Sequence, residues 1–310
     1  MAHLPPPRTS SPTEKKRAYA AWATICVVWG TTYFAIKVAL ESVPPFLMGG
    51  IRYLMAGAVL AAWIVARGGR LPGRASWRVF ALVGILMLGL GNGGVVLAEQ
   101  WVPSGLAAVV IATSPFWMVG VEALSPGGER LTGRHVIGLL LGFSGILLLV
   151  GPSLWGGSGQ RWQTLAGVLA LQLACAGWAV GSSYGKRHAP KVTPAMSAAA
   201  QMLCGGLVML TAGSLLGEWR ALSFTRVSTG ALIYLTVLGS LAAFVAYIYA
   251  LTHLPVSIVS LYAYINPVIA VALGTLLLGE PFGMRMVLAV AIILAGLAIV
   301  SSAKSRERAG

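Results

Sequence analysis

Long apolar runs broken by short polar segments dominate the pattern along this chain. A helix needs about 20 mostly apolar residues to cross the hydrocarbon core of a membrane. Windows of that kind predict spans at residues 18–38, 44–66, 79–98, 104–124, 135–152, 163–184, 194–216, 229–250, 256–278 and 285–302. Barrel strands would alternate apolar and polar residues, so the unbroken runs predict an all-α integral membrane protein with ten transmembrane helices.

The two ends of the chain differ from the runs between them. Residues 1–17 are rich in Pro, Ser, Lys and Arg, and residues 303–310 carry further charges. We predict both as cytoplasmic tails, the first of them disordered. The first apolar run is longer than the core of a signal peptide and lacks a small-residue cleavage site, so we expect it to remain as the first span.

Composition and charge narrow the class of protein. The chain is 57% hydrophobic and only 10% charged, whereas soluble domains carry roughly a quarter charged residues. The net charge of +14 is spread between the apolar runs and forms no basic patch, which argues against a nucleic-acid partner. The cysteines lie inside apolar runs without metal-ligand spacing, so we predict no metal and no cofactor.

Lysine and arginine between the runs indicate the orientation. With the N-terminus inside, the cytoplasmic segments hold 16 of these residues and the opposite side holds 5. Because Lys and Arg are retained on the cytoplasmic side, this split predicts a multi-pass protein of a bacterial inner membrane with both termini in the cytoplasm.

The two halves of the chain resemble each other. At an offset of 149 or 152 residues the matched pairs are Cys26 and Cys175, Trp29 and Trp178, Lys37 and Lys186, Pro45 and Pro194, Pro103 and Pro255, and Pro115 and Pro267. Chance similarity between apolar helices is the alternative to a duplicated five-helix unit, which would cover 18–152 and 163–302. Since five is odd, the second copy would be inverted, as in secondary transporters that open a midplane site alternately to either side.

Polar residues inside the runs are the candidates for a binding site. Arg52 stands about seven residues inside the second span, where a charge is costly unless it is paired or meets water. Either it bonds helix-end carbonyls, Glu41 or Glu99, or it contacts an anionic substrate group. Gln201 is its counterpart in the second half. Asn92 belongs to a glycine run spelled G-x-G-x-x-G, but a dinucleotide fingerprint needs a strand before it, so close helix packing or a distorted helix is the better interpretation.

Aromatic residues away from the span ends form a second set of candidates. They are Trp29, Trp117, Trp178, Tyr33, Tyr247 and Tyr264. Together they would line a cavity for amphipathic solutes, and core packing is the alternative for each one.

Two prolines, Pro115 and Pro267, fall near mid-membrane beside Ser114 and Asn266. A proline inside a helix frees a carbonyl and kinks the helix. We therefore expect either hinges or fixed packing kinks at these prolines, with Asn266 as a possible substrate-binding group.

Carboxylates are scarce. The chain has no Asp, and Glu99 and Glu122 are the glutamates that border the spans. Both are candidates for proton coupling, with plain interfacial charge as the alternative. Passive facilitated diffusion therefore stays open.

The chain resembles the EamA family of the drug/metabolite transporter superfamily. Its sequence motifs are especially similar to those of the YedA-like subgroup of exporters. The resemblance is carried by the segments Trp29-Gly-Thr-Thr-Tyr33, Pro44-Pro45, Ile51-Arg52-Tyr53, Gly91-Asn92-Gly93, Ala98-Glu99, Val102-Pro103-Ser104-Gly105, Tyr264-Ile-Asn266-Pro267 and Gly279-Glu280. It implies ten spans, cytoplasmic termini, a cavity between the repeats, and often efflux of amino acids or related metabolites.

We therefore expect a secondary transporter, an exporter of small amphipathic metabolites or drugs, and not an enzyme. Its partners would be a small-molecule substrate and the lipid bilayer. A non-transporting scaffold or sensor is the alternative, and a membrane-embedded enzyme fits less well because the histidines lack neighbouring acids. The oligomeric state, monomer or homodimer, stays open because Gly138-Leu-Leu-Leu-Gly142 fits a helix contact either between copies or within one chain.

Overall fold

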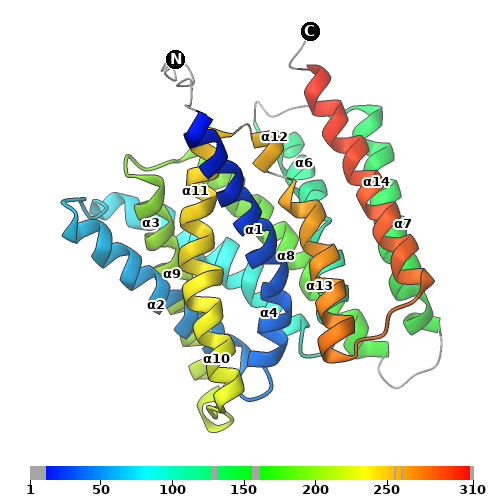
Figure 1. The fold of residues 1–310 in the computed structure, drawn as a ribbon, viewed down its shortest axis with the longest axis horizontal. Helices are drawn as coiled ribbons and strands as arrows, with labels where there is room; N and C mark the ends of the chain where they lie inside the picture. The colour runs from blue at the N-terminus through cyan, green and yellow to red at the C-terminus, as the bar shows by residue number, and fades with distance from the viewer. Residues whose placement is uncertain (1–11, 127–130, 156–160, 255, 260, 308–310) are drawn as a thin grey trace.

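The computed structural model of the chain describes residues 12–126, 131–155, 161–254, 256–259 and 261–307 (Figure 1). Within these ranges every regular element is a helix. Eight helices or helix runs are long and apolar enough to cross a membrane: Pro12–Ala39, Pro45–Ala66, Arg74–Ala98, Ser104–Leu124, Gly133–Gly151, Arg161–Arg187, Pro194–Leu215 and Arg226–Tyr247. Two shorter apolar helices follow, Tyr262–Leu278 and Met284–Val300.

The elements of the first half run back and forth between two ends of the molecule (Figure 1). They are α1 (Pro12–Ala39), α2 (Pro45–Ala66), α3 (Arg74–Gly84), the π-helix η1 (Ile85–Asn92), α4 (Gly93–Ala98), α5 (Ser104–Ile111), α6 (Ser114–Leu124) and α7 (Gly133–Trp155). We call the end at which α1 begins and α14 finishes the upper end, as drawn in Figure 1, and the opposite one the lower end.

The second half continues in the same way. It consists of α8 (Arg161–Arg187), α9 (Pro194–Leu215), the 3-10 turn η2 (Glu218–Arg220), α10 (Arg226–Tyr234), the π-helix η3 (Leu235–Ala242), α11 (Ala243–His253), α12 (Val256–Val259), α13 (Tyr262–Leu278) and α14 (Met284–Glu307).

Each predicted span falls on a helix or a run of helices, but four of them are subdivided. The spans predicted at 79–98 and 229–250 each contain a π-helical segment. The span predicted at 104–124 is broken near its middle, and the span predicted at 256–278 is broken near its start. The first helix begins at Pro12, inside the predicted tail 1–17, and the last continues to Glu307, inside the predicted tail 303–310. Lys, Arg, Glu and Ala favour helix, so both helices extend past their apolar parts. The remainder of both tails lies outside the described residues.

Small residues let two pairs of helices pack at close range. A Cβ on Gly50 of α2 would lie 2.7 Å from the main-chain nitrogen of Leu210 on α9. A Cβ on Gly138 of α7 would lie 2.7 Å from the carbonyl oxygen of Gly296 on α14. The Gly138–Gly142 motif is therefore used within the chain, in the α7–α14 pair at one side of the molecule (Figure 1).

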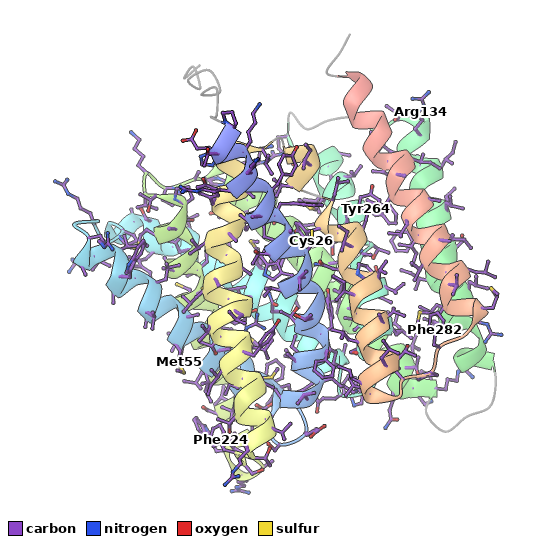
Figure 2. The ribbon with its side chains drawn as sticks, in the orientation of Figure 1. Cys26, Met55, Arg134, Phe224, Tyr264 and Phe282 are labelled. Atoms are coloured by element: carbon purple, nitrogen blue, oxygen red, sulfur yellow. The ribbon has the colours of Figure 1, made fainter. Side chains whose placement is uncertain are left out.

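The outer surface is apolar over much of its area. Met55, Phe224 and Phe282, which are labelled in Figure 2, are each more than half exposed. A soluble monomer rarely exposes large apolar patches. With the long apolar helices, this surface is that of a membrane protein.

Candidate functional site

Arg52 is the buried cation of the second helix. It lies on α2 with 6% of its surface exposed, and its Nε donates to the hydroxyl of Ser240 on η3 at 2.8 Å. Within the described residues no carboxylate lies within ion-pair distance of its guanidinium. Neither glutamate that was considered as a partner from the sequence, Glu41 or Glu99, makes an ion pair with it. A guanidinium has five N–H donors, so this one keeps capacity for an anionic group.

The π-helical turn of η3 explains why Arg52 and Trp29 meet there. The amide of Ala243 donates to the carbonyl of Leu238, five residues back, where an α-helix would use Gly239. The amide of Ala243 therefore does not occupy the carbonyl of Gly239, and the indole Nε1 of Trp29 donates to this carbonyl at 3.2 Å. We call Trp29, Arg52, Gly239 and Ser240 the Arg52 group.

An aromatic cluster adjoins the Arg52 group through Trp29. Its members are Trp29, Phe244, Tyr247 and Tyr262. The Trp29 ring centroid lies 5.0 Å from that of Tyr262, edge-on, and 5.3 Å from that of Tyr247. Phe244 packs on Tyr247 at 6.3 Å. The cation comes from α2 and the rings from α1, α11 and α13, so four elements bring one cation and several ring faces together.

Two members of this cluster, Tyr262 and Phe244, were not predicted from the sequence. Tyr262 lies four residues before Asn266, a spacing that places both on one helix face, and this spacing is the signal that identifies it. Asn266 is nearly buried, and with its amide nitrogen facing two carbonyls it donates to Cys26 and Tyr262, each at 3.0 Å. Pro267 follows inside α13.

A second polar cluster joins α6 to α8. Trp117 Nε1 donates to Gln172 Oε1 at 2.8 Å, and Gln172 Nε2 donates to Thr113 at 3.3 Å. Ser114 donates to the sulfur of Cys175 at 3.3 Å. Pro115 stands in the first turn of α6, directly after the break that follows α5. Trp117 is therefore fixed by Gln172 of α8, a residue that was not predicted from the sequence.

Three other predicted residues lie along η1 and the helices beside it. Asn92 donates to the carbonyl of Met87 at 3.4 Å within the π-helix, and the Trp178 ring packs against Gly91. Gln201 donates to Ser197 and lines a cleft of about 380 Å³ between α3, α8 and α9.

The remaining tyrosines of the predicted set pack elsewhere. Tyr33 lies against the large central core, and Tyr264 packs with Phe116, Leu297 and Val300.

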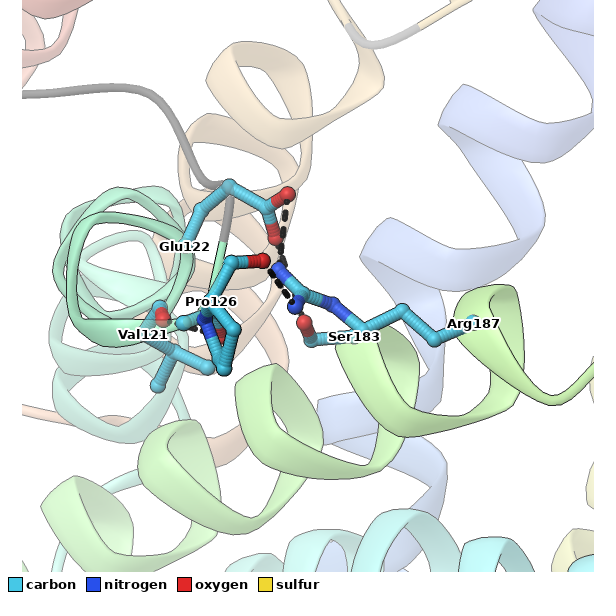
Figure 3. Close-up of polar contacts among 6 residues, drawn as sticks. Val121, Glu122, Pro126, Ser183 and Arg187 are labelled. Carbon is cyan, nitrogen blue, oxygen red and sulfur yellow. Dashed lines mark hydrogen bonds and ion pairs between the residues drawn. The ribbon is translucent and has the colours of Figure 1, made fainter.

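The two candidate glutamates have opposite environments. Glu122 lies at the upper end, pairs with Arg187 at 3.2 Å, accepts from Ser183 at 3.1 Å, and is about 29% exposed (Figure 3). Glu99 lies at the lower end between the spans Arg74–Ala98 and Ser104–Leu124, and it is fully buried. Neither of its carboxylate oxygens has a hydrogen-bond partner among the described residues.

Charged neighbours surround Glu99. The ammonium of Lys37 donates to the main-chain carbonyls of Glu99 and Val102. The carboxylate of Glu280 accepts from the amides of Ser104 and Gly105 at 2.6 and 2.9 Å. Burial raises the pKa of Glu99 well above its usual range, Lys37 opposes this rise, and Glu280 adds to it. We call Lys37, Glu99, Ser104 and Glu280 the lower clamp.

Comparison with known proteins gives one family. The model of the EamA-like transporter family matches the chain twice, over residues 17–151 and 165–302. The chain is 36% identical over 288 residues to a protein of Escherichia coli (strain K12) described as "Uncharacterized inner membrane transporter YedA", covering 92% of this chain and 91% of that one. It is 24% identical to "Uncharacterized transporter YvbV" of Bacillus subtilis (strain 168) over 95% of each.

The fold also matches a solved protein structure. The superposition has a TM-score of 0.64 at 25% sequence identity, and it covers 94% of this chain and 98% of the other. The helical arrangement is therefore shared over almost the full length of both proteins.

Proposed function

Because this chain belongs to the EamA-like transporter family, we propose that it is a secondary transporter that exports small amphipathic metabolites across a bacterial inner membrane. Ten spans with both termini in the cytoplasm are the topology we infer. The excess of Lys and Arg at the upper end supports that orientation, and the YedA relative is described as an inner membrane transporter.

We propose alternating access between two inverted repeats as the mechanism. The family model matches each half once, and the π-helices η1 and η3 occupy corresponding places in the two halves. Two contacts also correspond. Asn266 donates to Cys26 between α13 and α1, and Ser114 donates to Cys175 between α6 and α8. These are matched pairs of the internal repeat, and their recurrence supports a two-fold relation between the halves.

The substrate assignment rests on the environment of Arg52. A buried guanidinium without a carboxylate partner among the described residues, beside an aromatic cluster, fits a solute with an anionic group and an apolar body. Charge-assisted hydrogen bonds are the strong ones in a site of low dielectric. Amino acids and related carboxylates have this chemistry, so we infer that Arg52 binds the substrate carboxylate.

The test is flux into liposomes that contain the purified protein. The panel pairs each solute with its counterpart lacking the carboxylate, for example phenylalanine with phenethylamine. We expect saturable flux of the acid and little of the amine. Arg52→Gln is expected to raise the half-saturation concentration about tenfold or more, because a hydrogen bond to a charged group contributes about 1.5–3 kcal/mol.

The matched control is Arg78→Gln, because Arg78 is an exposed arginine on α3. It should leave flux unchanged. Flux that survives Arg52→Gln with the same preference for the acid would remove Arg52 from the site. Absence of flux for every solute in correctly folded protein would favour a scaffold or sensor.

A further inference from the structure

We propose that Glu99 takes up a proton when the lower end of the molecule closes and releases it to the external water when that end opens. This inference rests on the proposed transport cycle and on the proposed orientation, in which the lower end faces outside. External pH would then influence whether the lower end of the carrier is open or closed.

Glu280 closes the lower end of the molecule. Gly279 adopts a left-handed conformation with φ of 65°, which turns the chain back, so that the Glu280 amide donates to Gly274. The Glu280 carboxylate then caps the first amides of α5, where the helix dipole favours a negative charge. An element of the second half thereby holds a helix of the first.

The fit around that carboxylate is tight. A Cβ on Gly274 would lie 2.2 Å from Glu280 Oε2 and 3.0 Å from the Ser104 hydroxyl oxygen. The Ser104 hydroxyl is itself buried without a hydrogen-bond partner among the described residues. Opening of the lower end would require α5 and α13 to separate here and would admit water.

Ionisation of Glu99 is disfavoured while the lower end is closed. An ionised carboxylate without hydrogen bonds is very costly to bury, and Glu99 is fully buried with both oxygens unpartnered among the described residues. The groups that act on it are Lys37 and Tyr33 of α1 and Glu280 after α13. Glu280 carries the negative charge of the clamp and disfavours a second one.

The sign of the pH effect follows from these environments. In the closed state the pKa of Glu99 is raised by burial, whereas in a wet, open state we expect it to return to the ordinary range of glutamate. The closed state therefore binds more protons, and closure weakens as pH rises through the interval between the two values. Opening should gain up to about tenfold per pH unit in that interval, because one proton is released per opening.

Glu122 has no such role in this proposal. Its carboxylate is hydrogen bonded, paired with Arg187 and in contact with solvent at the other end of the molecule. It therefore serves as the matched comparison for Glu99.

The experiment measures opening without any substrate. Ser104→Cys is close to isosteric, and a membrane-impermeant maleimide added outside should reach it only when the lower end opens. The labelling rate is recorded between pH 5 and pH 8 above the background of the three native cysteines. It is divided by the rate of Phe224→Cys, an exposed position at the lower end, to remove the intrinsic pH dependence of thiols.

We expect the normalised rate of Ser104→Cys to rise severalfold or more with pH. Adding Glu99→Gln to Ser104→Cys should keep the normalised rate low and independent of pH, because glutamine stays neutral. Adding Glu122→Gln should leave the rise with pH intact. Adding Glu280→Gln should raise the rate at every pH by weakening the clamp.

Three results would overturn the inference. They are labelling of Ser104→Cys that does not change with pH, an undiminished pH-dependent rise with Glu99→Gln, and the absence of labelling at any pH. Liposome flux distinguishes these failures from failure of the transport proposal. Flux with pH-independent labelling removes only the role of Glu99, whereas pH-dependent labelling without flux of any solute counts against the proposed substrates.

Discussion

At the scale of single residues, the polar side chains of the apolar helices bond main-chain groups of distant helices. Trp29 donates to the Gly239 carbonyl, and Lys37 donates to the carbonyls of Glu99 and Val102. Main-chain groups that a helix break or a π-turn leaves unpaired must find partners, because lipid offers none. Arg52 differs, since it bonds only one hydroxyl within the described residues and keeps donors for a solute.

Substitution of Trp29 by Phe tests one of these bonds. The ring contacts with Tyr247 and Tyr262 should persist, but the donor to Gly239 is lost. A hydrogen bond contributes about 0.5–1.5 kcal/mol, so the half-saturation concentration for flux should rise up to about tenfold. Trp162→Phe, at an exposed position, is the control, and an equal effect of both variants would contradict the assigned role of Trp29.

At the scale of elements, the two π-helical segments are the departures from regular α-helix that shape the site. A π-turn inserts one extra residue into a helix and is frequent at functional sites. In η3 the carbonyl of Gly239 accepts from Trp29, and the hydroxyl of Ser240 accepts from Arg52. Gly239 leaves room there, since a Cβ would lie 3.2 Å from both Arg52 Nη2 and Thr32 Cγ2.

Gly239→Ala should therefore displace the Arg52 guanidinium and lower the rate of flux at subsaturating solute severalfold, with little loss of folded protein. The control is Gly230→Ala in α10 of the same span, where a Cβ would meet nothing within 4 Å. Unchanged flux in Gly239→Ala would show that the η3 surface does not border the site. Thermal unfolding in detergent checks that both variants remain folded.

At the scale of the whole molecule, the α7–α14 pair is a unit of its own. These helices pack mainly on each other, with fewer contacts to α6 and α8, and they stand at one side in Figure 1. Their closeness depends on glycines of both helices. A Cβ on Gly296 would lie 2.6 Å from the Gly138 carbonyl oxygen and 2.8 Å from the Gly142 nitrogen.

Gly296→Ala should force the pair apart and lower the free energy of unfolding by about 1–3 kcal/mol, the usual cost of overpacking. The readout is the thermal unfolding midpoint of the purified protein in detergent. Gly120→Ala on α6, where a Cβ would meet nothing, should leave the midpoint unchanged or slightly raised. A midpoint for Gly296→Ala that matches Gly120→Ala would mean that the two helices do not need this close approach.

Hydropathy predicted where the helices lie because each one needs a long apolar run, as the agreement over 44–66 and 194–216 illustrates. It could not predict η1 or η3, since one inserted residue scarcely changes a window average. The candidate site was predicted in part. Trp29, Arg52 and Tyr247 gather around η3, whereas Trp117 is bonded to Gln172 on α8.

Long-range partners explain the rest of what sequence reasoning missed. Ser240 and Glu280 matter because of residues 188 and 176 positions away, and no local pattern reports such a pairing. The contrast between Glu99 and Glu122 is of the same kind. Both border a span in the sequence, and only the packing of other helices makes Glu99 fully buried and leaves Glu122 partly exposed.

Glu218 and Glu280 bear on how the chain is made. Glu218 accepts from the amide of Leu47 at the start of α2, and Glu280 does the same for Ser104 at the start of α5, across 171 and 176 residues. A ribosome adding 5–20 residues per second needs about ten to thirty seconds to supply each acceptor. During that delay the two helix starts must be solvated by water or lipid headgroups at the membrane surface. The first half therefore reaches its final packing only after the second has been synthesised and inserted.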